Sequence, residues 1–446
     1  MIHTRRMSKT EPQPLEIAAS FAAIIGSTIA WVSAEFALAA ALYVAANSIV
    51  LLSDAWRQKQ VSYRTVLLFP FLLYAATPIL HIGWGGNTFD LSEKVFLPFL
   101  VGSWLTVITL YWGLPTQNYV SNNLLTSNTN EVNDDPVGSL AGIACMMFGL
   151  YLYTSLGTDV LSRAERLSGQ SFFQTFSELG FVSATMALFA ISVDSKGYGR
   201  KVSVALAALY TGVEILYFGD RRTALSLLLA LIVAAQCAGK LKLKIWHLTV
   251  AAGMLPLILV FGVLRSFPAA DWWDLVISGT VFQEFSLMRT ELGSAATVAN
   301  NVGLTHGTFS FQPSYHLIIL QVVPSRILTR ASWLWTPSQL YAYEYRFDVF
   351  AEGGAFGYNI LLESFQNLWI FGPIFLALVL RKTFFVFLRA TRLRLFLIEA
   401  FTYATVFIYR ADLASWAQTL VYVSLLGIGF WSLARFSNQT YKFSEK

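Results

Sequence analysis

Charge is scarce in this sequence, and so are cysteine and familiar catalytic motifs. Only 13% of its 446 residues are charged, whereas 55% are hydrophobic and 15% aromatic. Together with a positive mean hydropathy, this composition excludes an ordinary water-soluble globular chain and indicates a polytopic membrane protein. The formal net charge of +5 is attributed first to basic cytoplasmic loops, so nucleic acid is not expected as a partner.

The chain has only two cysteines and five histidines. Cys145 and Cys237 both fall in apolar segments, where each is expected to be a small buried hydrophobe, and no disulfide or cysteine metal site is expected. No GxxxxGK[ST] loop, HExxH or paired CxxC motif occurs, which excludes the recognised forms of nucleotide hydrolysis and zinc chemistry. We therefore expect neither a metal nor a cofactor.

What the sequence does have is a series of apolar runs, each long enough to cross a hydrocarbon core of about 30 Å as a helix. They predict an all-α fold of about twelve transmembrane helices, at residues 15–33, 35–53, 65–81, 95–113, 139–157, 177–193, 202–218, 222–238, 245–264, 359–380, 396–410 and 413–433. The first run could also be a signal peptide. Its length favours a retained anchor.

Basic residues predict the orientation of these helices, because Lys and Arg concentrate in short cytoplasmic loops. With both termini in the cytoplasm, the cytoplasmic segments hold 20 of the 31 basic residues. One loop, at about 114–138, should also be cytoplasmic, yet it has no Lys or Arg and contains Asp134 and Asp135. Acidic residues carry little weight in this rule, so the overall orientation is kept.

The hydrophobic pattern is interrupted over residues 266–358, which divides the chain into helices at 1–265, an outer loop, and helices with a cytoplasmic tail at 359–446. Apolar residues at three- and four-residue spacing between Val281 and Ala299 predict an amphipathic helix lying on the outer surface. The run from Leu317 to Val323 is too short to span and predicts an interfacial or re-entrant segment.

The basic residues left on the outer side are almost all arginine, whose planar fork suits phosphate oxygens better than lysine does. Four outer features carry the candidate site: Gly219-Asp220-Arg221-Arg222, Arg289, Ala351-Glu352-Gly353-Gly354 ahead of Glu363, and Arg410-Ala411-Asp412. Glu363 is expected about three turns into its helix, where a carboxylate needs a polar cavity or a partner, Arg410 being the most economical one. His316, in the outer stretch, is a further catalytic candidate.

The pattern EGGxxGxxxxxES over residues 352–364 is followed by Asn367 and Gly372. Together with the Gly-Asp-Arg-Arg tetrad, Arg289 and the Arg410-x-Asp412 turn, it resembles the bacterial O-antigen polymerases (Wzy-type repeat-unit polymerases), relatives in architecture of the O-antigen ligases. The resemblance covers the C-terminal half of the chain and implies a GT-C-like fold with a long periplasmic loop. One departure is Trp369, which stands where family members often have the first glycine of Asn-Phe-Gly-x-x-Gly.

This resemblance implies a glycosyltransferase of lipopolysaccharide biosynthesis in the bacterial inner membrane. It would move a glycan from undecaprenyl diphosphate to a hydroxyl of another lipid-linked repeat unit at the periplasmic face, without a metal. A polysaccharide chain-length regulator could be a partner. Arg221, Arg222, Arg289 and Arg410 would stabilise the leaving diphosphate, and Glu363, Glu352 or His316 would orient or deprotonate the hydroxyl. Asp220, Asp412, Gly353 and Gly354 would support them.

Two other functions fit the same residues. An O-antigen ligase uses the same donor with a lipid A-core acceptor, and a long outer loop does not separate the two enzymes. A lipid-linked oligosaccharide flippase or another transporter could also line an anion path with arginines. Such a transporter would often show two related halves with interrupted helices, and no such repeat occurs in this sequence.

Overall fold

The computed structural model shows an all-helical protein. It describes residues 14–80, 82–83, 93–117, 120–121, 135–156, 172–193, 198–214, 222–250, 260, 264, 271–280, 297–298, 300–302, 312–320, 335–345, 347, 358–390, 393–408 and 412–444. Within these ranges the only β pairing is a single bridge between Val61 and Leu243. Buried hydrophobic residues from most of these helices form one common core.

The helices of the first part are α1 (Pro14–Val32), α2 (Phe36–Leu51), α3 (Ser53–Gln58), α4 (Tyr63–Leu80), α5 (Glu93–Gly113), α7 (Asp135–Leu156), α9 (Phe172–Ser192), α10 (Gly199–Gly212) and α11 (Arg222–Cys237). Apart from the short α3, which lies between two predicted runs, they match the predicted apolar runs to within a few residues at most ends. Residues 245–250 begin the next predicted run as a helix, and most of the rest of that run lies outside the described residues.

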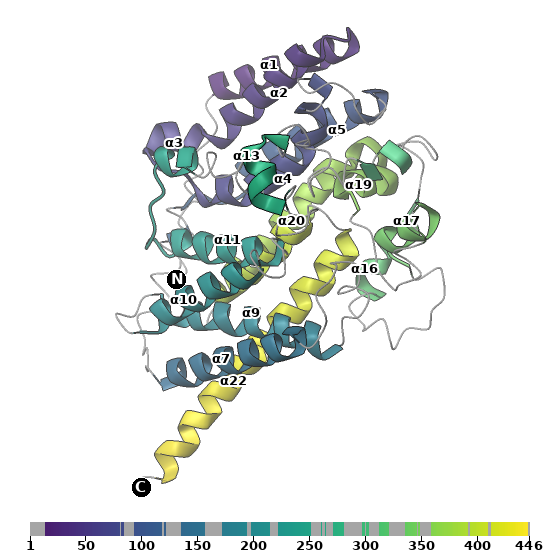
Figure 1. The fold of residues 1–446 in the computed structure, drawn as a ribbon. Helices are drawn as coiled ribbons and strands as arrows, with labels where there is room; N and C mark the ends of the chain where they lie inside the picture. Colours follow the sequence, from purple (N-terminus) through teal and green to yellow (C-terminus); the bar gives the residue numbers. More distant parts are fainter. Residues whose placement is uncertain are drawn as a thin grey trace.

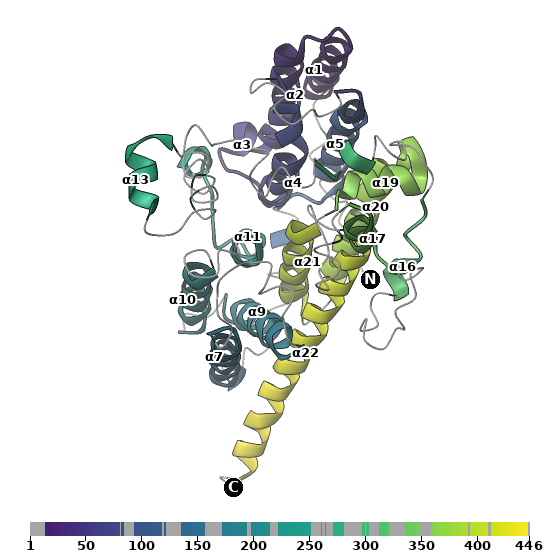
Figure 2. The same ribbon diagram turned by 45° about the vertical axis from the view of Figure 1, so that its right-hand side comes forward.

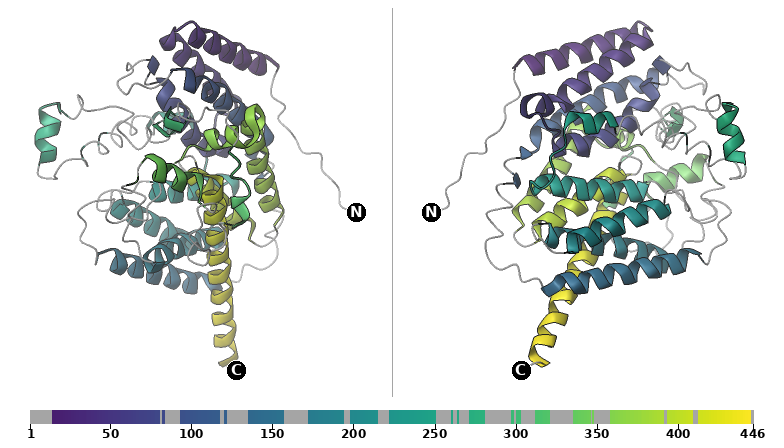
Figure 3. Two further views of the ribbon diagram at one scale, coloured as in Figure 1. Left: turned by 90° about the vertical axis from the view of Figure 1, so that its right-hand side faces the viewer. Right: turned by 60° about the vertical axis from the view of Figure 1, so that its left-hand side comes forward.

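The second part contains three short helices, α13 (Trp272–Ile277), α16 (Leu317–Leu320) and α17 (Pro337–Tyr345), followed by α19 (Ile360–Leu368), α20 (Gly372–Arg389), α21 (Arg394–Ile408) and α22 (Leu413–Ser444). At 32 residues, or about 48 Å, α22 is longer than predicted and extends past the other helices (Figure 3). The predicted helix at 281–299 falls almost entirely outside the described residues.

Six of the described helical segments are long and apolar enough to cross a membrane. They are Pro14–Val32, Phe96–Gly113, Pro136–Ser155, Phe173–Ser192, Ile360–Arg389 and Leu413–Phe436. Three shorter apolar helices accompany them, at Phe36–Leu51, Tyr63–Leu72 and Thr223–Cys237. The chain is therefore an all-α membrane protein, and the number of twelve spans stays a prediction.

Neighbouring helices pack through small residues, as membrane helices do when their backbones approach closely. In the α1–α2 pair, Ser27 Oγ donates a 2.7 Å hydrogen bond to the carbonyl oxygen of Ala39. The interior helix is α21, which packs against α4, α9, α11, α20 and α22 (Figure 2). Cys237 is buried as predicted, whereas Cys145 is exposed on α7, because it lies on a helix face that no described element covers.

Three connections meet at one end of the bundle, which we call the basic-loop end: residues 52–62, 114–121 and 236–244. The Val61 amide donates to the Leu243 carbonyl oxygen at 2.7 Å. Gln117 Nε2 and Ser121 Oγ donate to the carbonyl oxygens of Gln236 and Cys237, at 3.1 and 2.8 Å. The acidic 114–138 loop thus begins on the same side as two basic loops, in agreement with the predicted alternation.

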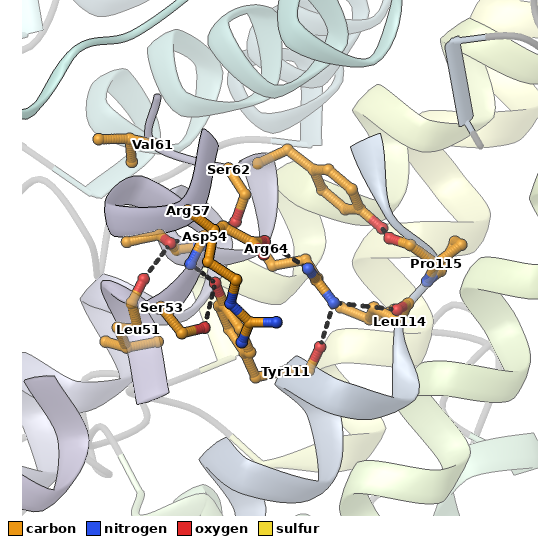
Figure 4. A network of polar contacts seen from close by, with 12 residues as sticks. Leu51, Ser53, Asp54, Arg57, Val61, Ser62, Arg64, Tyr111, Leu114 and Pro115 are labelled. Atoms are coloured by element: carbon orange, nitrogen blue, oxygen red, sulfur yellow. Dashed lines mark hydrogen bonds and ion pairs between the residues drawn. The ribbon is translucent and has the colours of Figure 1, made fainter. Parts of the chain in front are cut away.

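A buried ion pair stabilises this end (Figure 4). The side chains of Arg64 and Asp54 are only 3% and 4% exposed, and their charged groups bond directly. Arg64 Nη1 also donates to the Tyr111 carbonyl oxygen at 2.8 Å, and its guanidinium carbon lies 4.5 Å from the centre of the Tyr111 ring. These contacts satisfy a charge that would otherwise be costly to bury, and they join α3, α4 and α5.

Candidate functional site

A second polar cluster lies at the opposite end of the bundle, where α16, α17 and α19 gather (Figure 1). It joins parts of the chain that are far apart in sequence: residues 312–316, the start of α17, the whole of α19 and the start of α22. We call it the outer cluster and define it by Gln312, Ser314, Ser338, Tyr358, Glu363, Gln366, Asn367, Asp412 and Leu413. The first helix of the interrupted stretch, α13, stands apart from it (Figure 2).

Helix α19 begins with a side-chain cap, because Asn359 Oδ1 accepts from the amides of Leu361 and Leu362 at 2.9 and 3.1 Å. Glu363 therefore lies in the first turn of α19, which corrects the prediction of about three turns. The reason is that the helix begins at Ile360 and not at the EGG motif. A carboxylate in the first turn interacts favourably with the helix dipole.

Glu363 is 1% exposed, and both of its carboxylate oxygens accept hydrogen bonds. Oε1 accepts from Ser314 Oγ at 2.7 Å, and Oε2 accepts from the amide of Leu413 at 2.7 Å. The donors within the described chain are thus neutral, whereas Arg410, the expected partner, lies outside the described residues. Glu363 ties the loop around Ser314 to the first residue of α22.

Asn367 lies one helical turn beyond Glu363 and bonds to the same loop. Its Oδ1 accepts from the amides of Ser314 and Tyr315 at 2.8 and 3.1 Å. Its Nδ2 donates to Ser314 Oγ at 2.9 Å and to the Glu363 carbonyl oxygen at 2.8 Å. Three of these four hydrogen bonds therefore hold residues 314–315 against α19, and the fourth lies within α19.

Gln366 extends the same attachment on the neighbouring face of α19. Its carbonyl oxygen accepts from the Gln312 amide at 3.1 Å, and its Oε1 accepts from the Tyr358 hydroxyl at 2.8 Å. Burial and the nearby Glu363 carboxylate raise the pKa of Tyr358 far above its usual range, so its phenol stays protonated and remains a donor.

Asp412 caps α22 and fixes α17. Its Oδ1 accepts from the amide of Ser415 at 2.7 Å, the usual contact of a helix-capping carboxylate. Its Oδ2 accepts from Ser338 Oγ at 2.6 Å, and Ser338 lies in the first turn of α17. Two of the carboxyl-bearing residues that the sequence singled out, Glu363 and Asp412, are thus brought together, since Glu363 bonds to the residue that follows Asp412.

The outer cluster leaves His316 at the surface. This side chain is exposed, and it follows directly after the two residues that Asn367 holds. A turn that is hydrogen-bonded to α19 therefore carries an exposed imidazole ring. Tyr315, between Ser314 and His316, stacks on Phe375 with ring centres 5.8 Å apart, which orients the turn further.

The remaining predicted residues are placed only in part. Arg222 begins α11, whose last residue lies at the basic-loop end, so the start of α11 lies toward the outer end. Nothing is described of its side chain. Arg221, Arg289, Arg410, Glu352, Asp220, Gly353 and Gly354 lie outside the described residues. In the described part of the chain, no group of three or more His, Cys, Asp and Glu side chains could hold a metal ion.

The predicted single helix at 359–380 is broken, which is a further correction. Trp369 has φ 56° and ψ −143°, a backbone conformation that strongly favours glycine. Gly372 then lies so close to α19 that a Cβ atom there would be 1.9 Å from the Ser364 carbonyl oxygen. The backbone therefore favours glycine at both positions, but the sequence has glycine only at residue 372.

Three further carboxyls inside the bundle were not predicted as notable from the sequence: Glu214 and Glu399, which are buried, and Glu178, which is partly buried. Tyr210 donates to Glu178 Oε1 at 2.8 Å, and Tyr151 donates to Glu214 Oε1. Each of these acids lies in a predicted apolar run, so the reasoning applied to Glu363 would have found them. It would not have found Ser314 or Ser338, whose importance depends on tertiary contacts alone.

Comparison with protein-family models, with curated proteins and with solved structures gives no match for this chain.

Proposed function

We propose that this membrane protein polymerises undecaprenyl-diphosphate-linked repeat units at the periplasmic face of the bacterial inner membrane. The observation that carries the proposal is the outer cluster. In it, Glu363 and Asn367 attach the 312–316 turn to the start of α22, at the end opposite the basic loops. These residues belong to the same ES and Asn motif on which the resemblance to O-antigen polymerases rests.

The break at Trp369 supports the same reading. The polymerase pattern often has a glycine at this position, and here the backbone takes a conformation that favours glycine although the residue is tryptophan. The helix–break–helix geometry of this motif would thus be retained while one of its residues differs.

In the proposed reaction, a sugar hydroxyl of one lipid-linked unit attacks the anomeric carbon of the glycan on another. The bond from that carbon to the diphosphate oxygen breaks, and undecaprenyl diphosphate leaves with the electron pair. The hydroxyl proton passes to a base. Arg221, Arg222, Arg289 and Arg410 would stabilise the charge that develops on the diphosphate, which a guanidinium fork in a partly dry site does well.

The geometry favours Glu363 as a positioning residue in this scheme. Its two oxygens are occupied and its side chain is 1% exposed, so it has little access to a substrate hydroxyl. His316, on the turn that Glu363 and Asn367 hold, is exposed and can meet a substrate, and Glu352 is the other candidate for the base.

Purified protein supplied with lipid-linked repeat units and no other acceptor tests this function. A polymerase needs only this substrate and should form a ladder of products, each longer by one unit. A ligase should leave the substrate unchanged until a lipid A-core acceptor is added. A transporter should leave it unchanged in both reactions. An unchanged substrate in both reactions would refute the polymerase and ligase proposals together.

The transporter alternative retains one specific observation in its favour. Glu214 is buried and Glu178 is partly buried between helices of the bundle, and carboxyls inside membrane proteins often mark ion or substrate paths. Reconstituted vesicles that move a lipid-linked oligosaccharide between leaflets would support this alternative.

A further inference from the structure

The interior helix α21 carries a carboxyl that the proposed reaction does not use. Glu399 is 0% exposed, and the helix that carries it packs against α4, α9, α11, α20 and α22. Neither of its carboxylate oxygens has a hydrogen-bond partner among the described residues. Glu363 differs sharply, because each of its oxygens accepts a hydrogen bond at 2.7 Å.

Among the described residues, an ionised carboxylate in this position would have neither a hydrogen-bond donor nor an ion-pair partner. Neutral donors, ion pairs and water all stabilise buried charge, and the described part of the chain places no donor on Glu399. The nearby Cys237 thiol of α11 is close enough to interact with it electrostatically, but it is neither a cation nor a strong donor. The neighbouring hydroxyl of Thr402 already donates to the Ile398 carbonyl oxygen at 2.8 Å.

The chemistry of the site favours a proton over a metal ion. A hard metal cation such as Mg²⁺ or Ca²⁺ takes six or more oxygen ligands, whereas a proton needs a single carboxylate oxygen. Tyr403, one turn further along α21, lies within electrostatic range of Tyr210, whose hydroxyl donates to Glu178. Hydroxyl groups of this kind can pass protons and would be poor ligands for a metal.

We propose that Glu399 is a proton-binding site in the interior of the bundle, distinct from the outer cluster and independent of the proposed polymerase activity. Binding converts the carboxylate to the neutral acid by forming one O–H bond, and no other bond changes. The site would hold this proton at neutral pH while the protein is folded in its membrane.

Infrared difference spectroscopy tests the proposal without requiring a reagent to enter the bundle. The full-length protein in lipid at neutral pH is compared with its Glu399→Gln variant. The wild-type spectrum should contain an additional carboxylic-acid C=O band that shifts in D₂O and is missing from the variant. A difference spectrum that contains only carboxylate bands would overturn the proposal.

Glu16→Gln is the matched control, because Glu16 pairs with Arg57 and is partly exposed. Its difference spectrum should contain carboxylate bands only. The Glu399 measurement is repeated with sodium chloride in place of choline chloride, and the acid band should persist. Loss of the band in sodium alone would overturn the assignment to a proton in favour of a metal cation.

The thermal stability of Glu399→Met provides a second, independent readout. Methionine has a similar length and no group that needs a hydrogen bond, so the midpoint of unfolding should equal or exceed that of the wild type. A lower midpoint for both Glu399→Met and Glu399→Gln would show that the carboxyl makes stabilising contacts as an anion, which would contradict the proposal.

Discussion

At the scale of single residues, two ion pairs at the basic-loop end should differ greatly in their effect on stability. Asp54 is buried against Arg64, so Asp54→Asn leaves a guanidinium in a dry site and should lower the free energy of unfolding by about 3–5 kcal/mol. Glu16 pairs with Arg57 where both side chains are partly exposed, and Glu16→Gln should cost only about 0–1 kcal/mol. Denaturant unfolding in a mixed micelle measures both, and equal losses would contradict the arrangement in Figure 4.

Trp369 supplies the second residue-scale prediction. Its positive φ costs on the order of 1–3 kcal/mol, and glycine removes that strain. Trp369→Gly should therefore raise the midpoint of thermal unfolding, since the side chain that it removes is 64% exposed.

Ile370→Gly is the control for this change. It removes a side chain that is 60% exposed at a position without a positive φ, so it should lower the midpoint. Equal losses in the two variants would show that Trp369 is not strained.

At the scale of elements, hydropathy predicted most helices well, because the backbone of a long apolar run in lipid must make its hydrogen bonds within a helix. It could not predict the break between α19 and α20, because Trp369 and its neighbours are as apolar as the helices around them. The approach of Gly372 to the Ser364 carbonyl oxygen, which marks the break, depends on three-dimensional packing.

The candidate site, like the helices, could be predicted from the sequence only in part. Charged residues in an apolar chain are conspicuous, so Glu363 and Asp412 could be named from the sequence. Their actual partners, Ser314, Leu413 and Ser338, could not, since two are ordinary serines and the third acts through its backbone amide. The prediction that Cys145 is buried was wrong for a related reason, because hydropathy does not tell which face of an apolar helix meets lipid.

The contact between two loops at the basic-loop end predicts that they can be cross-linked without loss of activity. Val61 and Leu243 form an antiparallel bridge, whose Cα atoms are normally about 4.5–5.5 Å apart and within the range of a disulfide. In a background with Cys145→Ser and Cys237→Ala, Val61→Cys/Leu243→Cys should cross-link on mild oxidation. Polymerase activity should persist after cross-linking, because the outer cluster lies at the other end.

Val61→Cys combined with Lys240→Cys is the control, since Lys240 is exposed and is not bridged to Val61. It should cross-link more slowly. Loss of activity confined to the cross-linked Val61→Cys/Leu243→Cys protein would indicate a mechanism in which this end must open, as a transporter requires.

At the scale of the whole molecule, the basic-loop end and the outer cluster should lie on opposite sides of the membrane. Lys242→Cys and Glu344→Cys place one exposed thiol at each end, again in a background without native cysteines. A membrane-impermeant maleimide added from the periplasmic side should label Glu344→Cys and spare Lys242→Cys, because Lys and Arg concentrate in cytoplasmic loops. The reverse pattern would invert the topology and move the outer cluster to the cytoplasmic face.

The most direct test of the proposed function is the lipopolysaccharide banding of a strain that lacks this protein, complemented with wild type or with Glu363→Gln. Glutamine can still accept from the Leu413 amide and donate to Ser314 Oγ, so the variant should insert and fold. Without the protein, the core should carry a single repeat unit. Wild type should restore the full ladder. Glu363→Gln at equal expression should not, because the amide keeps both hydrogen bonds but removes the negative charge that would hold Arg410 in place for the diphosphate. Uncapped core in the deletion strain, or a full ladder from Glu363→Gln, would contradict the account.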